Sequence, residues 1–260
     1  MKKGIFLLPF FLILIFTLNN CNSDATGSNN NTGTLSISLT DAPAAYDSII
    51  IVFTEISAHI DSEWVHVTRD PVRVNLLDWS NGETFLLGSA EVPAGKYTQI
   101  RIKIDAASIG VKGEVHELIV PSGLKTGLKL GPQFTISEGS TYSLVLDFEA
   151  NRSVVVLGPK ENPNGYKLKP HIRVITEALT GSISGTVLNP EDIPFAYAIL
   201  GSDTVTSTAV DTTSGNFKLS FLPEDTYTVS VEDTSGKDFS QSSIFVTAGN
   251  NYDLGSITLD

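Results

Sequence analysis

Apolar and polar side chains alternate strictly in several short stretches of the chain. A period of two places the apolar members on one face of a β-strand and the polar members on the other. We therefore predict strands with one buried and one solvated face, so that Val145 and Asp147 are expected on the solvent side. The apolar positions are Leu35, Ile37 and Leu39 in the first stretch, Ile100, Ile102 and Ile104 in the second, and Leu144, Leu146 and Phe148 in the third.

Further short runs are bounded by Gly, Pro, Asn or Asp clusters, which are typical of turns between strands. No window keeps a helical period for ten residues, and the one predicted helical turn is Leu76–Trp79. Many short strands with frequent turns indicate an all-β chain of two β-sandwich domains, Ig-like or prealbumin-like. The additional predicted strands are 48–60, 64–67, 72–76, 114–120, 128–130 and 171–175, then 183–188, 197–200, 204–210, 216–221, 227–231, 243–246 and 256–259.

One short motif occurs in both halves of the chain. Residues 92–98 (VPAGKYT) and 222–228 (LPEDTYT) each place a proline turn four residues before a tyrosine that enters a strand. Proline sets the turn, and the tyrosine then enters a strand. We predict that the rings of Tyr97 and Tyr227 both lie on the core side.

The first twenty residues have the pattern of an export signal. Lys2 and Lys3 precede an apolar stretch from Ile5 to Leu18, which ends in two asparagines. The stretch is shorter than a membrane-spanning helix needs and has no basic cluster after it, so we expect residues 1–20 to be a cleaved signal peptide.

The chain contains a single cysteine, Cys21, directly after the expected cleavage point. It cannot form a disulfide within the chain. The region resembles a bacterial lipoprotein signal, with Leu18 at position −3 and Asn20 where Gly or Ala is usual at −1. The resemblance implies lipid attachment (palmitate among the acyl groups) at Cys21, since two or more acyl chains hold a protein stably at a bilayer. Asn22 at +2 favours a bacterial outer membrane, with the protein facing the periplasm or the cell surface.

The expected domain order follows from these segments. Residues 21–33 form the lipidated cysteine and a flexible tether without large apolar side chains. The first sandwich is expected at 34–179 and the second at 180–260.

Residues 181–260 resemble the carboxypeptidase regulatory-like domains, which are prealbumin-type sandwiches without a nucleophile or metal site. Glu224-Asp225 replaces the Pro-Gly-like turn common in that family. The matching pieces are Gly185-Thr186-Val187, Pro194, Ala196 and Ala198-Ile199-Leu200, then Asp211, Ser214-Gly215-Asn216-Phe217, Leu222-Pro223 and Tyr227-Thr228-Val229.

Residues 33–177 resemble the bacterial domain of unknown function 4382, a family without assigned biochemistry. The resemblance implies exported, lipid-anchored proteins in which such domains often accompany regulatory-like domains. It is carried by Gly33-Thr34-Leu35-Ser36-Ile37, Thr40-Asp41-Ala42-Pro43, Val92-Pro93-Ala94-Gly95-Lys96-Tyr97-Thr98-Gln99-Ile100-Arg101 and Leu168-Lys169-Pro170-His171-Ile172.

Two sequence motifs come close to catalytic signatures without matching them. His116-Glu117 begins like a zinc-peptidase helix, but Val120 stands at the second histidine position and the segment alternates as a strand. In residues 181–185 (GSISG), Ile183 occupies the nucleophile position of a hydrolase elbow. We therefore predict no catalytic residue, no cofactor site and no metal site.

Several polar and aromatic residues remain as candidates. Trp64 and Trp79 are the expected ligand contacts, because an indole offers a flat apolar platform for a sugar, although core packing is the commoner role. A calcium site at Asp41 with Asp47, or at Asp147 with Glu149, is the weaker alternative to Asx turns and solvated strand faces.

The formal net charge is −12, which argues against nucleic acid as a partner. We expect a non-catalytic binding or scaffold lipoprotein, held at a membrane through its lipid, with a glycan or protein ligand. The alternatives are a hydrolase assembled from scattered residues (Asp41, Asp147, Glu149 and His171) and an envelope spacer without a ligand. The oligomeric state is left open.

Overall fold

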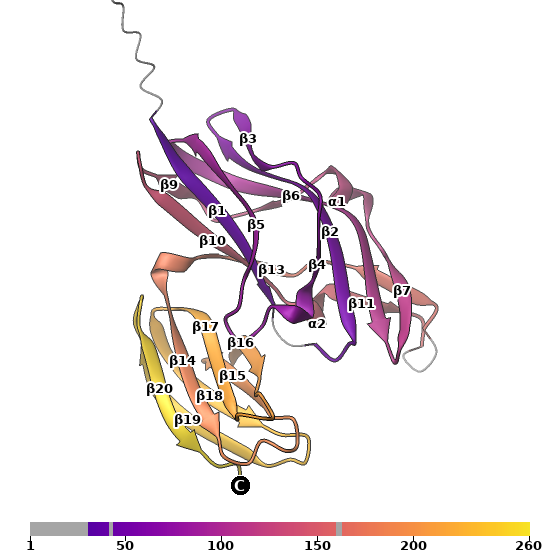
Figure 1. The fold of residues 1–260 in the computed structure, drawn as a ribbon, viewed down its shortest axis with the longest axis vertical. Coiled ribbons are helices and arrows are strands. Elements are labelled where there is room, and N and C mark those ends of the chain that lie inside the picture. Colours follow the sequence, from indigo (N-terminus) through magenta and orange to yellow (C-terminus); the bar gives the residue numbers. More distant parts are fainter. Residues whose placement is uncertain (1–30, 42–43, 160–162) are drawn as a thin grey trace, which may run out of the picture. The chain divides into compact units, whose positions relative to one another are not determined.

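The computed structural model describes residues 31–41, 44–159 and 163–260, and residues 31–260 belong to one compact unit. The chain is all-β with short helical turns, as the sequence predicts (Figure 1). Its strands are β1 (Thr32–Asp41), β2 (Ser48–Ile60), β3 (Glu63–Thr68), β4 (Val72–Asn75), β5 (Phe85–Pro93), β6 (Gly95–Val111), β7 (Glu114–Ile119), β8 (Leu128–Leu130), β9 (Phe134–Ile136), β10 (Thr141–Phe148), β11 (Val154–Leu157), β12 (Gly165–Leu168), β13 (Ile172–Thr176), β14 (Thr180–Val187), β15 (Phe195–Leu200), β16 (Asp203–Ala209), β17 (Asn216–Pro223), β18 (Asp225–Glu232), β19 (Asp238–Val246) and β20 (Asn251–Ile257). The helical turns are η1 (Leu76–Asp78), α1 (Ser122–Thr126), α2 (Ala150–Ser153) and η2 (Glu177–Leu179).

The N-terminal sandwich consists of two sheets. One has the strand order β13-β10-β1-β5, in which β1 and β10 are parallel and the outer pairs antiparallel. The other runs β11-β12-β7-β6-β2-β3, with β4 paired to β2 and with β8 and β9 paired to β6. The alternating isoleucines of β6 and leucines of β1 are fully buried in one core cluster, so the period-two pattern marks the inner faces correctly.

The C-terminal sandwich has its own core. Its sheets have the orders β17-β14-β20 and β16-β15-β18-β19. Buried side chains such as Ile183 and Val229 form a second cluster that shares no residue with the first. Gly215 ends the turn before β17 with φ +76°, and a Cβ there would lie 2.1 Å from the carbonyl oxygen of Val187, so this turn requires glycine.

The repeated tyrosine motif has the same structure in both sandwiches. Tyr97 is 0 % exposed and Tyr227 1 %. The Tyr97 hydroxyl donates to the carbonyl of Pro93 at 2.7 Å, and the Tyr227 hydroxyl donates to the carbonyl of Pro223 at 2.9 Å. The prediction that both rings lie in the core is confirmed, and each hydroxyl keeps a partner four residues upstream.

β10 differs from its predicted role as a half-exposed strand. Val145 and Asp147, which were expected to face solvent, are 2 % and 3 % exposed. β10 lies between β1 and β13 inside its sheet, and its last five residues are buried on both faces. The expectation fails because alternation reports one buried face and cannot show whether other segments cover the second.

Several elements were not predicted, although the helical turn at Leu76 is present as η1. α1 and α2 are too short for a helical period to appear, and β11 and β12 are only four residues each. β5, the short β9 and most of β20 were also missed. The expected tether extends to residue 33, but β1 begins at Thr32, which pairs with Pro93.

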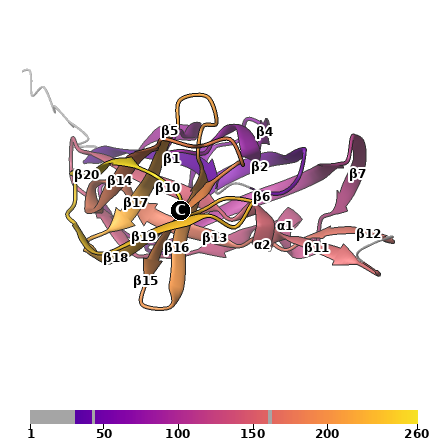
Figure 2. The same cartoon turned by 90° about the horizontal axis from the view of Figure 1, so that it is seen from below.

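Hairpin β11–β12 lies beside α1 and α2, and Figure 2 shows these four elements together. Over the ranges that the structure describes, no helix has the length and apolar character needed to cross a bilayer.

Candidate functional site

The outer face of β3, β2, β6 and β8 carries polar, aromatic and basic side chains. The inner positions of these strands are isoleucines and other core residues, so alternation turns the remaining side chains outward. Strand register brings residues that are distant in the sequence into one row across the sheet. That row consists of Lys129, Arg101, Ser57 and His66. We call this surface, together with Trp64 and His59, the Trp64 face.

Trp64 is half-buried and is contacted by cations. The Arg101 guanidinium carbon lies 4.3 Å from the centroid of the indole ring, and the Lys129 ammonium nitrogen lies 5.7 Å from it. The His59 ring packs beside the indole at 5.0 Å between centroids and is held by its Nδ1, 2.8 Å from the hydroxyl of Thr98. Arg101 therefore occupies part of the surface that a sugar ring would need for stacking on Trp64.

Glu55 is the carboxylate at the centre of this face. Its Oε1 lies 3.0 Å from Arg101 Nη2 and 3.7 Å from His66 Nδ1, and its Oε2 lies 2.8 Å from Lys103 Nζ. Burial acts to raise the pKa of Glu55, but the hydrogen bond and charge of Lys103, with the charges of His66 and Arg101, lower it below its ordinary value. One carboxylate thus faces two permanent cations and a histidine, and Lys129 adds a further positive charge.

Trp79, the other predicted ligand contact, lies in a different setting. It is half-buried against the N-terminal core cluster, to which Trp64 does not belong, and it meets Phe85 edge-on at 5.2 Å between centroids. Its carbonyl accepts hydrogen bonds from the Asp41 amide at 2.8 Å and the Thr40 hydroxyl at 3.1 Å. The structure therefore places Trp79 in packing and Trp64 on the outer face of a sheet.

The four residues considered for a dispersed hydrolase site lie at one end of the first sandwich. β1 and β10 are paired so that Thr40 lies opposite Asp147. Asp41 Oδ1 accepts the Ala150 amide at 2.9 Å. Glu149 follows β10, and its Oε1 lies 3.1 Å from Nδ1 of His171. The parallel pairing of β1 with β10, more than a hundred residues apart in the sequence, brings Asp41 close to Asp147 and the residues that follow it.

Each of these carboxylates already has structural partners. Asp147 Oδ2 accepts hydrogen bonds from Arg173 at 2.5 and 3.1 Å across the β10–β13 pair. Glu149 accepts Arg152 Nη1 at 2.8 Å. Burial raises the pKa of Asp147 above its ordinary value, against the opposing charge and hydrogen bond of Arg173.

Ser153 completes a set that superficially resembles a Ser-His-Glu triad. However, its side chain is fully buried, its hydroxyl donates to the Glu149 carbonyl at 2.8 Å, and it accepts the backbone amide of His171 at 2.8 Å. A nucleophile must instead be accessible and bonded to the imidazole of its base. Ser153 therefore ties two backbone segments together. Sequence reasoning missed Ser153 and Arg152 because α2 is too short for a helical spacing to be recognised, and it missed Arg173 because that residue reaches Asp147 only through the pairing of β10 with β13.

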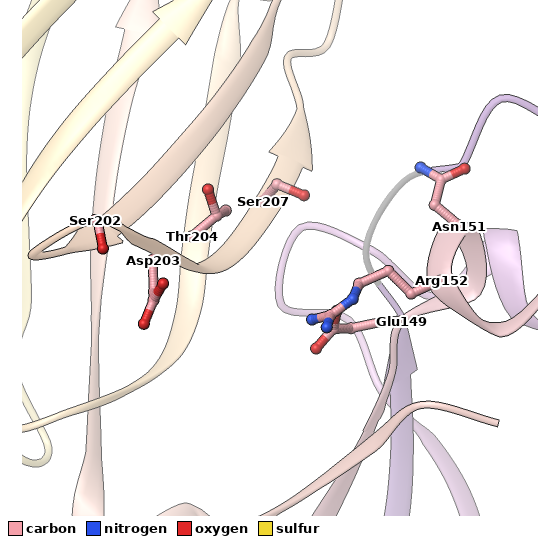
Figure 3. Close-up of a pocket in the computed structure, with 7 residues that line it drawn as sticks. All are labelled: Glu149, Asn151, Arg152, Ser202, Asp203, Thr204 and Ser207. Atoms are coloured by element: carbon pink, nitrogen blue, oxygen red, sulfur yellow. The ribbon is translucent and has the colours of Figure 1, made fainter.

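A polar pocket of about 590 Å³ opens beside α2 (Figure 3). In Figure 3 the side chains of Glu149 and Arg152 lie on one side, and those from β16 and the turn before it lie on the other. Its lining lacks large apolar side chains, so it offers hydrogen bonds but little hydrophobic burial. The lining residues are Glu149, Asn151, Arg152, Ser202, Asp203, Thr204 and Ser207.

The weaker calcium alternative and the two motifs that were judged not to be catalytic signatures can be compared with the geometry. Within the described ranges, no three His, Cys, Asp or Glu residues are grouped as a metal site requires. Asp47 accepts the Gly113 amide at 2.7 Å. His116 lies in strand β7, and Ile183 is fully buried in β14. The proposed acceptor of the lipid, Cys21, lies outside the described residues.

A family model described as "Domain of unknown function (DUF4382)" matches residues 32–170, more than half of the chain. The chain belongs to the DUF4382 family. In this DUF4382 protein a second model, the carboxypeptidase regulatory-like domain, matches residues 182–260. Both resemblances inferred from sequence motifs are thereby confirmed. Neither description names a catalytic activity.

No curated protein matches this DUF4382 protein. Among solved structures, the Bacillus anthracis TIE protein is 13 % identical with a TM-score of 0.25, and the match covers 88 % of this chain and 34 % of that one. The major pilin subunit BcpA of Bacillus cereus is 11 % identical (TM-score 0.20; 88 % and 70 % covered), and a fimbrial protein of Bacteroides ovatus is 12 % identical (TM-score 0.22; 88 % and 50 % covered). The chain thus spans about a third of the Bacillus anthracis protein.

Proposed function

We propose that this DUF4382 protein is an exported lipoprotein, anchored through Cys21 to a bacterial outer membrane, that binds an acidic glycan at the Trp64 face without catalysing a reaction. The leader, the lone cysteine and the residues after it support the anchor. The two sandwiches support a binding or scaffold role because they present large, rigid sheet faces to the surroundings.

The arrangement around Trp64 is the observation that carries the proposed ligand. The chain has a net charge of −12, yet Arg101 and Lys129 converge on one half-buried indole. Arg101 already donates to Ser57 through Nε and to Glu55 through Nη2, so Lys129 is the cation with which a sugar carboxylate can pair while the apolar face of the sugar contacts the indole. A neutral sugar would compete with Arg101 for the ring and would leave Lys129, for which the described residues supply no carboxylate partner, without an anion.

The hydrolase alternative is disfavoured by the engagement of its carboxylates. A general base needs a carboxylate or imidazole free to reach substrate, whereas Asp147 is buried against Arg173, and Glu149 is shared between Arg152 and His171. A hydrolase screen of the mature protein tests this, with and without a chelator. Turnover that disappears in Glu149→Gln or His171→Asn would contradict the non-catalytic proposal.

Ligand binding is tested with residues 22–260 on an array of neutral and uronic-acid glycans. We expect acidic glycans alone to bind, more weakly as ionic strength rises. Trp64→Ala should weaken binding by about tenfold or more, because aromatic anchors dominate small interfaces. Lys129→Gln should weaken it less, and the exposed Lys237→Gln on the second sandwich is the matched control. A blank array would favour the envelope spacer instead.

The anchor is tested separately by expressing the full chain in bacteria and partitioning the extract with detergent. We expect the protein in the detergent phase and the Cys21→Ser variant in the aqueous phase, because the variant lacks the acyl chains. Wild-type protein that stays wholly aqueous would contradict the anchor while leaving the glycan proposal intact.

A further inference from the structure

An apolar groove lies between hairpin β11–β12 and the segment containing α1 and β8. Its volume is about 740 Å³, within the range of roughly 300–1,000 Å³ usual for small-molecule sites. Leu124 and Leu128 line it on one side, and Val155 and Leu157 line it on the other. This groove, at the hairpin shown in Figure 2, lies outside the polar pocket and has no part in the carboxylate cluster.

Strand alternation explains the apolar wall. β11 directs Val154 and Val156 into the sandwich core. Val155 and Leu157 do not belong to that core and are half-buried, because they face the groove instead. The hairpin thus has apolar side chains on both faces of one edge strand, whereas a solvated face normally carries polar residues there.

The polar side chains of the groove are of one kind only. Lys129, Lys167 and Lys169 line it, and the other lining residues are leucine, valine, proline and glycine. All three lysines are exposed, and among the residues that the structure describes none of them has a carboxylate partner. Lysine ammonium groups donate hydrogen bonds and accept none. The site therefore suits a ligand with an apolar body and an anionic, acceptor-only head.

We infer that this groove binds the carboxylate and alkyl chain of a long-chain fatty acid. The apolar walls bury the chain, and Lys167 and Lys169 at the rim pair with the carboxylate. Sugar hydroxyls and peptide groups would find no side-chain acceptor along the apolar walls, whereas an alkyl chain needs none, and a groove of this size is suited to one amphiphile. This inference goes beyond the glycan proposal, and Lys167 and Lys169 are not part of the Trp64 face.

Calorimetric titration of residues 22–260, carrying Cys21→Ser, with octanoate, decanoate and dodecanoate below their micelle concentrations tests the inference. We expect affinity to rise about fourfold for each added methylene that the groove buries. Dodecanol, which keeps the chain but lacks the charge, should bind more weakly than dodecanoate. Equal binding of the two, or no dependence on chain length, would overturn the assignment.

Two variants locate the site. The double change Lys167→Gln with Lys169→Gln alters only exposed side chains and should weaken dodecanoate binding roughly fivefold, with Lys237→Gln as control. Leu157→Asp places a carboxylate in the wall and should abolish binding in protein that keeps its thermal transition. Unchanged affinity in the double variant would refute the inference, as would binding to phosphatidylglycerol vesicles without binding to dodecanoate. Failure here would leave glycan binding at Trp64 unaffected.

Discussion

At the scale of single residues, the two buried tyrosines show how one local motif serves two separate cores. In each sandwich a proline carbonyl accepts the hydroxyl of the tyrosine four residues later. The ring fills the core while its one polar atom is satisfied by the chain itself. Both features are local, which is why the sequence motif alone predicts that the rings of Tyr97 and Tyr227 are buried.

Tyr97→Phe removes this hydrogen bond and leaves the Pro93 carbonyl without it. We expect the free energy of unfolding to fall by about 1 kcal/mol, the usual net contribution of one hydrogen bond within a protein, because Pro93 is exposed and this bond is only partly buried. Urea unfolding followed by fluorescence measures the change. Tyr252→Phe, at a tyrosine that is 40 % exposed, is the control and should change stability by less than about 0.5 kcal/mol. Equal effects would show that the hydrogen bond contributes nothing.

Because its hydroxyl is buried, Tyr97 should also make the folded state less stable at alkaline pH. Burial, with a smaller contribution from the charge of Asp61, raises the pKa of Tyr97 from 10.0 to about 12. The folded state therefore holds this proton more tightly than the unfolded state, so its stabilising effect is present below pH 10 and is lost as the pH rises towards 12. Unfolding curves at pH 9 and 11 should show a smaller loss in Tyr97→Phe than in the wild type. Identical losses would contradict the assignment.

At the scale of elements, β10 shows what a strand pattern leaves undecided. Its leucines and phenylalanine face the core as predicted. Asp147 is buried as well, and it pairs with Arg173 on the neighbouring strand β13. A buried carboxylate is tolerated only with a partner, because removing a charge from water costs several kcal/mol. The partner comes from a strand whose register the sequence does not reveal.

Arg173→Met should therefore cost about 3 kcal/mol of stability at pH 7, since it leaves the Asp147 carboxylate buried and unpaired. Arg152→Met is the matched control. Arg152 forms an ion pair with Glu149, but its side chain is 61 % exposed, so the expected loss of stability is below about 1 kcal/mol. Chemical denaturation of both variants measures the difference, and similar costs would refute the burial argument.

The pH dependence of Arg173→Met follows from the same pair. Burial already raises the pKa of Asp147, and losing Arg173 raises it further. A carboxyl with a raised folded-state pKa favours folding below its unfolded pKa, and this stabilisation is lost as the pH rises through the folded pKa. The destabilisation should thus be smaller at pH 4 than at pH 7. A cost independent of pH would indicate lost packing by the arginine stem instead.

At the scale of the whole molecule, the two sandwiches have cores without a shared residue. Ile37 and Ile183 are both 0 % exposed and belong to different cores. The change of either to alanine should cost about 2–5 kcal/mol within its own sandwich. We expect Ile37→Ala and Ile183→Ala to lower different transitions in a calorimetric scan. A single transition lowered equally by both would show that the sandwiches unfold as one unit.

The sequence by itself determined the all-β class, the two families and the inner faces of most strands, because alternation and turn motifs are local properties of a strand. It also singled out Trp64, which the structure places beside Arg101 and Lys129. What it could not supply is strand pairing across long separations. Only the tertiary structure brings Asp147 to Arg173, Lys129 to the indole, and Leu157 and Leu128 into one apolar groove, since each depends on how segments far apart in the chain are placed together.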